Sequence, residues 1–188
     1  MPAVKKLYAQ HGILFREVSA WPEGVSKISV FNAASIVAHK IDEYREYQPE
    51  TMLILSGHSL GAIVALLAAS IEPPDGLVLE EPPIGGSYDF ALHIGGFDLK
   101  NRAVISGLRK NSPGITELNE HLLKFGYEWP PTLEIKGWFG IVGQLLFGAF
   151  PNTGFGKVAR FPWMNHSQTW EHPKAIARIA KFAHSLED

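Results

Sequence analysis

The stretch MLILSGHSLGAIVALLAAS, from Met52 to Ser70, decides the fold of this chain. An almost wholly apolar run at 51–56 leads into Gly-His-Ser-Leu-Gly at 57–61, and an apolar helix pattern over 60–70 follows at once. A strand without polar alternation is typical of the buried middle of a parallel sheet. A helix that is apolar nearly all round is also expected to be buried. The stretch therefore predicts a strand, a tight turn and a helix at the centre of an α/β core.

The turn within this stretch places a serine between two glycines. Gly-x-Ser-x-Gly between a strand and a helix is the arrangement of a nucleophile elbow, in which Ser59 takes a strained backbone conformation above the sheet edge. Side chains at Gly57 and Gly61 would collide with the neighbouring strand and helix. His58 fills the position before the serine, and the Leu60 N–H begins the helix, where unpaired donors favour an oxyanion. The alternative is that Ser59 only caps a helix beside a tight turn.

Composition limits the classes of protein to which the chain can belong. Its 188 residues suit one domain spanning 1–188, and a net charge of −2 argues against a nucleic-acid partner. The absence of cysteine excludes disulfides, thiol catalysis and thiolate metal sites. The first residues carry charges where a signal peptide would be apolar, and the apolar run at 138–150 is too short to span a bilayer. We expect a soluble, cytoplasmic protein with no membrane span.

Short apolar runs alternate with longer amphipathic segments along the chain, which is the pattern of a mainly parallel sheet covered by helices. Strands are expected at 13–18, 51–56, 77–80, 131–137 and 157–161. Helices are expected before Gly12, from a cap at Asn32 to a stop before Pro49, over 60–70, and from Pro173 onward.

The regular alternation breaks down between about 84 and 130, where glycines and prolines surround one amphipathic segment at 115–125. We interpret this region as a small helical lid inserted into the sheet topology. The whole pattern predicts a three-layer α/β fold with a reduced sheet of about five strands.

Four segments together resemble the α/β-hydrolase superfamily in its lipase, esterase and thioesterase members. They are LSGHSLGAIVALLAA, LVLEEPP, PTLEIKG and NHSQTWEHPKAIARIAKF, in the order in which that family has its elbow, sixth strand, seventh strand and catalytic-histidine segment. The family fold has more strands before the elbow than this chain has. The resemblance therefore implies either a minimal sheet or an exposed edge that a second copy of the chain, a homodimer partner, would cover.

The resemblance also implies which histidine would be the general base. Of eight histidines, His166 lies in WMNHSQTWEHP, between the last expected strand and the last helix. The order serine before histidine matches the family. The rival is His172, but its EHP wording resembles the helix entry that follows the catalytic histidine in the family.

The acid that would orient this histidine is missing from its usual place. In the family an aspartate follows the seventh strand, where this chain has GWFGI at 137–141 without a carboxylate. Some lipases of the superfamily use the end of the sixth strand instead, where Glu81 precedes two prolines. The alternatives are Glu80 beside it, a lid residue such as Asp89 or Asp98, or no acid at all, which would slow the reaction by orders of magnitude.

The predicted function is that of a serine hydrolase with Ser59, His166 and Glu81 as its catalytic residues and Leu60 N–H as an oxyanion donor. An apolar segment at 137–156 suits a hydrophobic acyl or aromatic ester or thioester. A second oxyanion donor is expected near 19–21. No metal or cofactor is expected, because the histidines are scattered and no glycine-rich phosphate loop follows a strand. The competing hypothesis is a catalytically altered member that acts as a binding or non-hydrolytic biosynthetic protein.

Overall fold

The computed structural model of the chain describes most of its predicted core. The described residues are 2–20, 29–85, 116, 120, 129–138, 153–154, 156–165 and 168–187. Their helices and strands are, in chain order, α1 (Pro2–Ala9), α2 (Val30–Tyr47), β1 (Ile54–His58), α3 (Leu60–Ile71), β2 (Gly76–Glu80), β3 (Thr132–Gly137), β4 (Lys157–Phe161) and α8 (Pro173–His184).

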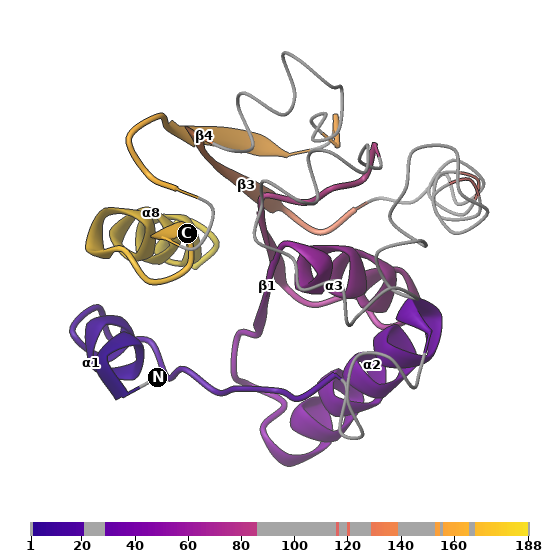
Figure 1. Ribbon diagram of the computed structural model, residues 1–188. Helices are drawn as coiled ribbons and strands as arrows, with labels where there is room; N and C mark the ends of the chain where they lie inside the picture. The colour runs from indigo at the N-terminus through magenta and orange to yellow at the C-terminus, as the bar shows by residue number, and fades with distance from the viewer. Residues whose placement is uncertain are drawn as a thin grey trace.

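The described strands form one parallel sheet in the order β1-β2-β3-β4. Figure 1 shows α2 and α3 on one side of this sheet and α1 and α8 on the other. These layers confirm the predicted three-layer α/β fold. Because all strands run the same way, their carboxyl ends share one edge, and the register places His58 beside Glu80 and Glu80 beside Ile135. The residues that follow β1, β2 and β3 are therefore neighbours.

Two apolar clusters hold the layers together, one on each face of the sheet. Leu77 and Leu79 of β2 pack with α2 and α3, whereas Val78 packs with α1 and α8. Successive side chains of a strand point to opposite faces, so β2 contributes to both clusters and is buried along its whole length. This central position fixes the place of the residues that follow β2.

The predicted helix ends are partly confirmed. α2 ends at Tyr47, before Pro49 as predicted, and α8 begins at Pro173. The predicted cap at Asn32 is wrong, because α2 begins at Val30 and Ser29 is its N-cap. The Ser29 hydroxyl accepts the N–H of Asn32 at 3.1 Å, which satisfies one of the donors left free at a helix start.

The predicted strand at 13–18 is wrong. These residues adopt neither helix nor strand, so the described sheet has four strands instead of about five. Ile13 and Phe15 pack on the α1–α8 cluster, with the Phe15 ring stacked on Tyr8 at 5.0 Å, while Leu14 is 74% exposed. The alternation of apolar and polar residues thus reflects burial of one side of the segment. A segment that packs on helices has such a buried side even when it pairs with no strand.

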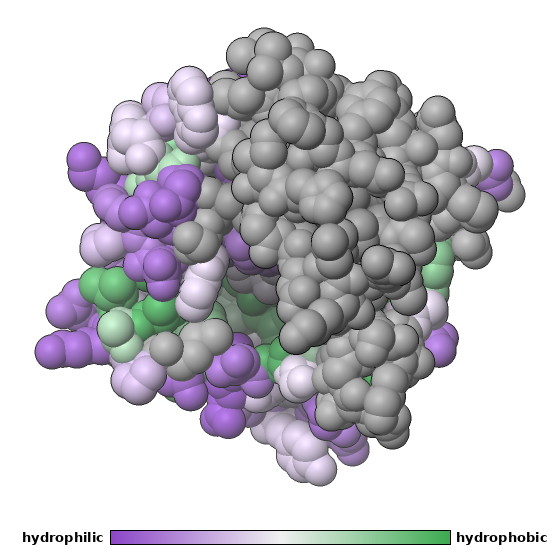
Figure 2. Space-filling view, in the orientation of Figure 1, coloured by the Kyte–Doolittle hydropathy of each residue, from purple (hydrophilic) through white to green (hydrophobic). Residues whose placement is uncertain are grey.

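β1 is an edge strand of the described sheet, and Ser56 at its centre is exposed. Figure 2 shows hydrophobic side chains lining a hollow on this face of the molecule, among hydrophilic ones. In the same orientation, Figure 1 has the α1 and α8 layer to the left of β1. Whether a second copy covers this edge stays a prediction.

Most of the predicted lid at 84–130 lies outside the described residues. Two described residues within its predicted helix at 115–125, Thr116 and Glu120, are both helical. Within the described part of the chain, no helix is long and apolar enough to cross a membrane.

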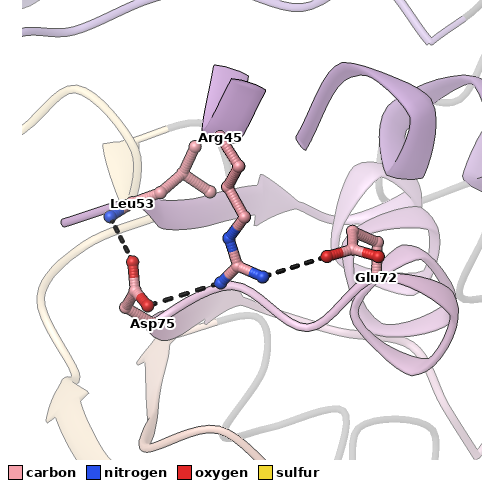
Figure 3. A network of polar contacts seen from close by, with 4 residues as sticks. All are labelled: Arg45, Leu53, Glu72 and Asp75. Carbon is pink, nitrogen blue, oxygen red and sulfur yellow. Dashed lines mark hydrogen bonds and ion pairs between the residues drawn. The ribbon is translucent and has the colours of Figure 1, made fainter. Parts of the chain in front are cut away.

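A polar network joins the helix ends to the amino ends of the first two strands (Figure 3). Arg45 of α2 donates to Glu72, just after α3, at 2.9 Å and to Asp75, just before β2, at 3.3 Å. The other oxygen of Asp75 accepts the backbone N–H of Leu53 at 2.7 Å. This network lies at the opposite edge from the carboxyl ends of the strands, so it stabilises the scaffold away from Ser59.

Candidate functional site

Ser59 follows β1 directly and has the strained backbone that the sequence predicted. Its φ is 53° and its ψ is −120°, a conformation that costs a residue with a Cβ about 1–3 kcal/mol. Its N–H donates to the carbonyl of Glu80 at 2.8 Å, and its own carbonyl accepts the N–H of Ala62 at 2.9 Å. These two hydrogen bonds join the turn to β2 and to α3, and they hold the strained conformation in place.

The two glycines beside this turn differ in their surroundings. A Cβ on Gly57 would lie 2.2 Å from the carbonyl oxygen of Gly61 and 2.8 Å from Cα of Ala62, so no side chain fits there. The predicted reason for glycine at 57 is therefore confirmed. For Gly61 the same reason is wrong, since no described atom beyond the helix's own backbone lies within 4 Å of a Cβ built there.

The Ser59 hydroxyl is inside the protein rather than in water. The residue is 7% exposed, and its Oγ is buried without a hydrogen-bond partner among the residues that the structure describes. Leu60 is the first residue of α3, so its N–H has no acceptor within the helix. A buried hydroxyl beside a free helix N-terminus is an arrangement that can bind an anion formed at the serine.

Glu81 follows β2 and also has a positive φ, of 50°. Of the non-glycine residues in the described ranges, only Ser59 and Glu81 have positive φ values. Glu81 is fully buried, its N–H donates to the carbonyl of Ile135 at 2.9 Å, and its Oε1 accepts the N–H of Gly137 at 2.8 Å. The two strained residues therefore follow adjacent strands at the same edge of the sheet.

Residues after β4 lie at Gly137, where the Glu81 carboxylate also lies. A Cβ on Gly137 would lie 2.7 Å from the carbonyl oxygen of Met164, 2.9 Å from Oε1 of Glu81 and 3.0 Å from Cγ2 of Thr169. Met164 also accepts the N–H of Trp138 at 2.6 Å. Residues on both sides of His166 in the chain are thus close to Gly137 and Glu81. His166 itself lies outside the described residues.

Glu80 differs from Glu81 in both position and environment. It is the last residue of β2 and faces the α1 and α8 layer, where its Oε1 accepts the Ser56 hydroxyl at 3.0 Å. Burial raises the pKa of the Glu80 carboxyl to about 8; the hydrogen bond from Ser56 lowers this pKa, and the charge of Glu81 adds to the rise. Burial, together with the charge of Glu80, also raises the pKa of Tyr8. Glu80 is thus a protonated core residue near neutral pH, on the face that carries α1.

The other candidates from the sequence have separate positions. His172 is the N-cap of α8, where its Nδ1 accepts the N–H of Lys174 at 3.2 Å, so it has a structural role. Asp89 and Asp98 lie outside the described residues, as does Trp21 at the end of the segment expected to give a second oxyanion donor. No three histidine, aspartate or glutamate side chains of the described ranges converge to hold a metal ion.

A buried charged pair on β3 was not predicted from the sequence. Lys136 and Glu134 are both 0% exposed, with Nζ 3.9 Å from Oε2. The other oxygen of Glu134 accepts the N–H of Thr153 at 2.8 Å as well as its hydroxyl. Charges alternate with Leu133 and Ile135 along TLEIKG, a pattern that ordinarily indicates one solvated face. Only the three-dimensional structure shows that both faces are covered.

Comparison with solved structures agrees with this topology. The peroxisomal alpha-beta-hydrolase Lpx1 of Saccharomyces cerevisiae superposes with a TM-score of 0.61 at 15% identity, over 98% of this chain and 74% of that one. The chain has the α/β-hydrolase fold. A Staphylococcus aureus protein of unknown function matches with a TM-score of 0.51 at 12% identity, over 86% of this chain and 74% of that one.

An alpha/beta hydrolase from the metagenome of Moroccan lagoon sediments has 20% identity and a TM-score of 0.48, over 92% of this chain and 77% of that one. No family model and no curated protein sequence matches the chain. In this fold, β1, Ser59 and α3 follow one another as a strand, a turn and a helix. The likeness to the yeast and Staphylococcus aureus structures establishes the fold, and the chemistry must be argued from the residues of this chain.

Proposed function

We propose that the chain is a serine hydrolase that cleaves a carboxylic ester or thioester with a hydrophobic acyl or aromatic group. The observation that carries this proposal is the backbone strain at Ser59 and Glu81, which follow adjacent parallel strands. Strained non-glycine residues persist only where the surrounding structure over-determines them, and they cluster at active sites. Two such residues at one sheet edge, of the types needed for nucleophile and acid, favour a catalytic site over a helix cap.

In the proposed reaction, Ser59 Oγ attacks the acyl carbon while His166 takes the hydroxyl proton. The Leu60 N–H donates to the oxyanion of the tetrahedral intermediate, which collapses and expels the alcohol or thiol with the proton from His166. Water then attacks the acyl-enzyme by the same steps and releases the carboxylic acid and free Ser59. Glu81 accepts a hydrogen bond from the second ring nitrogen of His166 and stabilises the imidazolium.

The surroundings of Glu81 support its assignment as the acid. Its main chain and its carboxylate are both fixed by β3, through the carbonyl of Ile135 and the N–H of Gly137. Met164 and Thr169, which precede and follow His166 in the chain, lie beside Gly137 at the same point. A carboxylate held near residues that precede and follow the histidine supports the proposal that Glu81 orients its imidazole.

Two exposed tryptophans support an apolar substrate. Trp138 follows β3 and Trp163 follows β4, and their exposed fractions are 59% and 60%. Both therefore lie at the carboxyl edge of the sheet, on the same edge as Ser59. Large exposed aromatic side chains near a reactive group favour binding of a hydrophobic acyl or aromatic moiety.

The test is covalent labelling with a fluorophosphonate probe, followed by peptide mapping, together with hydrolysis of p-nitrophenyl esters of increasing acyl length. We expect labelling at Ser59, loss of labelling and turnover in Ser59→Ala, and a rise in kcat/KM from acetyl to octanoyl esters. A folded wild-type protein that the probe does not label would refute the hydrolase and favour the altered, non-hydrolytic member. Turnover retained in Ser59→Ala would refute the nucleophile.

The two candidate histidines provide a matched comparison. His166→Ala should lower kcat by several orders of magnitude, because Ser59 loses its general base. His172→Ala should leave kcat within about twofold and cost roughly 1 kcal/mol of stability, because it removes a helix cap. The reverse result would transfer the role of the base to His172.

A further inference from the structure

The two helices on one side of the sheet, α1 and α8, carry positive charge and no negative charge. They lie side by side (Figure 1) and share an apolar cluster against the sheet. Neither helix contains an acidic residue, and their lysine and arginine side chains are Lys5, Lys6, Lys174, Arg178 and Lys181. Because the whole chain has a net charge of −2, positive charge is concentrated on this layer.

Helix geometry turns some of these side chains away from the sheet. Lys174 and Lys181 lie two turns apart on the face of α8 opposite its buried residues, and both are exposed. α1 buries Val4 and Tyr8, while Lys6 between them is exposed. In the orientation of Figure 1, Figure 2 shows hydrophilic side chains along the left of the molecule, where α1 and α8 lie. The layer therefore presents its lysines to the outside.

The basic side chains of this layer differ from those of the opposite layer in their partners. On α2, Lys40 is paired with Glu43, and Arg45 is paired with Glu72 and Asp75. Within the described ranges, none of the five basic side chains of α1 and α8 forms an ion pair. Their charges are thus not neutralised within the fold.

The stability of α8 does not account for its charges. The first turn of a helix favours acidic side chains and disfavours cations, yet α8 has Lys174 there and no acid. Glu171 precedes the helix without pairing to it, and Glu187 after the helix is paired with His184 at 3.2 Å. The lysines of this face are therefore free to interact with an anionic partner.

Exposed apolar side chains lie beside both ends of α8. Trp163 is 60% exposed, and Nζ of Lys174 lies over its ring, 5.4 Å from the ring centre. Leu14 is 74% exposed and comes three residues after His11, whose carbonyl oxygen is 3.1 Å from Nε2 of His184 at the end of α8. Basic side chains together with exposed Trp and Leu are typical of protein surfaces that lie on anionic membranes.

We propose that the layer formed by α1 and α8 docks on an anionic lipid surface. Its lysines bind the headgroups, while Trp163 and Leu14 enter the boundary between headgroups and acyl chains. We favour a lipid surface over a nucleic acid or an acidic protein because a bilayer interface receives basic and apolar side chains without a matching contour. α8 follows β4 and begins at the carboxyl edge of the sheet, so docking would hold the edge with Ser59 close to the lipid. Docking itself does not depend on the proposed hydrolysis.

The test is co-sedimentation with vesicles of phosphatidylcholine, with and without about 30% phosphatidylserine, in about 0.1 M salt. The wild type should bind only the vesicles with phosphatidylserine and should be released by about 1 M salt. Each basic side chain near an anionic surface contributes about fivefold in affinity, so Lys181→Gln should weaken binding about fivefold and Lys6→Gln/Lys181→Gln about 25-fold. Lys40→Gln, which removes the same charge from the opposite layer, should leave binding unchanged. Leu14→Ser should weaken binding several-fold.

Thermal unfolding followed by circular dichroism checks that each variant is folded. A wild type that does not bind phosphatidylserine vesicles, or equal losses in Lys40→Gln and Lys181→Gln, would overturn the proposal. The same holds if the wild type binds polyglutamate or single-stranded DNA more tightly than vesicles and Leu14→Ser has no effect, which would assign the face to an acidic protein or a nucleic acid. These outcomes are independent of fluorophosphonate labelling at Ser59, so docking and hydrolysis can fail separately.

Discussion

Gly57 and Gly61 flank Ser59 symmetrically in the sequence, yet the structure predicts opposite effects when each is replaced by alanine. In Gly57→Ala the new Cβ would lie 2.2 Å from the carbonyl oxygen of Gly61, 2.5 Å from its carbonyl carbon and 2.8 Å from Cα of Ala62. All three atoms belong to the backbone at the start of α3, so no side-chain rotation can relieve the contact. The turn must open, and β1 and α3 must separate.

The magnitude follows from the kind of atom that must move. Overpacking of a core costs typically about 1–3 kcal/mol when side chains can adjust, so a clash with the backbone should cost at least about 3 kcal/mol. For a domain of this size, each kcal/mol lowers Tm by roughly 2–4 °C, so Tm should fall by roughly 6–12 °C. At Gly61 no described neighbour obstructs a Cβ, and alanine gains up to about 1 kcal/mol over glycine inside a helix.

The assay is thermal and urea unfolding of both variants, followed by far-ultraviolet circular dichroism, with the rate of fluorophosphonate labelling as a second readout. Gly57→Ala should lose stability and labelling together, because the strained turn at Ser59 depends on the close approach of residues 57 and 61. Gly61→Ala should unfold at or above the wild-type temperature. Equal stabilities of the two variants would refute the geometric account of the turn.

Three further predictions use neighbouring residues as controls for each other. Glu81→Gln should lower kcat by about 10²–10⁴-fold with little effect on KM, whereas Glu80→Gln should leave kcat within a few-fold; equal rates for the two variants would remove Glu81 from the mechanism. Because burial raises the pKa of Glu80 from 4.5 to about 8, the folded protein holds a proton that the unfolded chain releases, so the free energy of unfolding should fall between these pH values. Urea titrations at pH 5 and pH 8 should show this loss in the wild type and a smaller one in Glu80→Gln. Arg45→Ala should lower the free energy of unfolding by no more than about 1 kcal/mol, as the loss of an exposed ion pair does. Asp75→Ala should lower it more, because the N–H of Leu53 also loses its acceptor, and kcat should be unchanged in both variants.

The sequence predicted the parts of the fold that depend on continuous burial. β1 and β2 follow from apolar runs between turn residues, β3 and β4 were predicted from segments that also carry charges, and the strained serine follows from its strand–turn–helix setting. The segment at 13–18 was misread because packing on helices buries alternate residues just as strand pairing does.

The residues that form helix caps and buried polar pairs were harder to predict, because several residues able to fill the same role lie within a few positions of each other. Ser29 and Asn32 are both good helix caps three residues apart, and only the backbone shows that the helix starts at Val30. The pair formed by Glu134 and Lys136 could not be found from its alternating pattern, since that pattern does not reveal what covers the second face of β3.

Gly137 at the end of β3 and the buried Glu81 after β2 are two parts of one arrangement. Gly137 occupies the end of β3, and the space that its side chain would fill is bounded by Oε1 of Glu81, the carbonyl of Met164 and the methyl group of Thr169. A side chain at 137, carboxylate or not, would displace the carboxylate that reaches this point from β2. The left-handed backbone of Glu81 is part of the same arrangement. It ends the strand geometry of β2 at the residue whose carboxylate accepts the hydrogen bond from the Gly137 N–H. If Glu81 is the acid, as proposed, its place depends on two features together: a glycine at 137 that leaves room for the carboxylate, and a left-handed backbone at the end of β2.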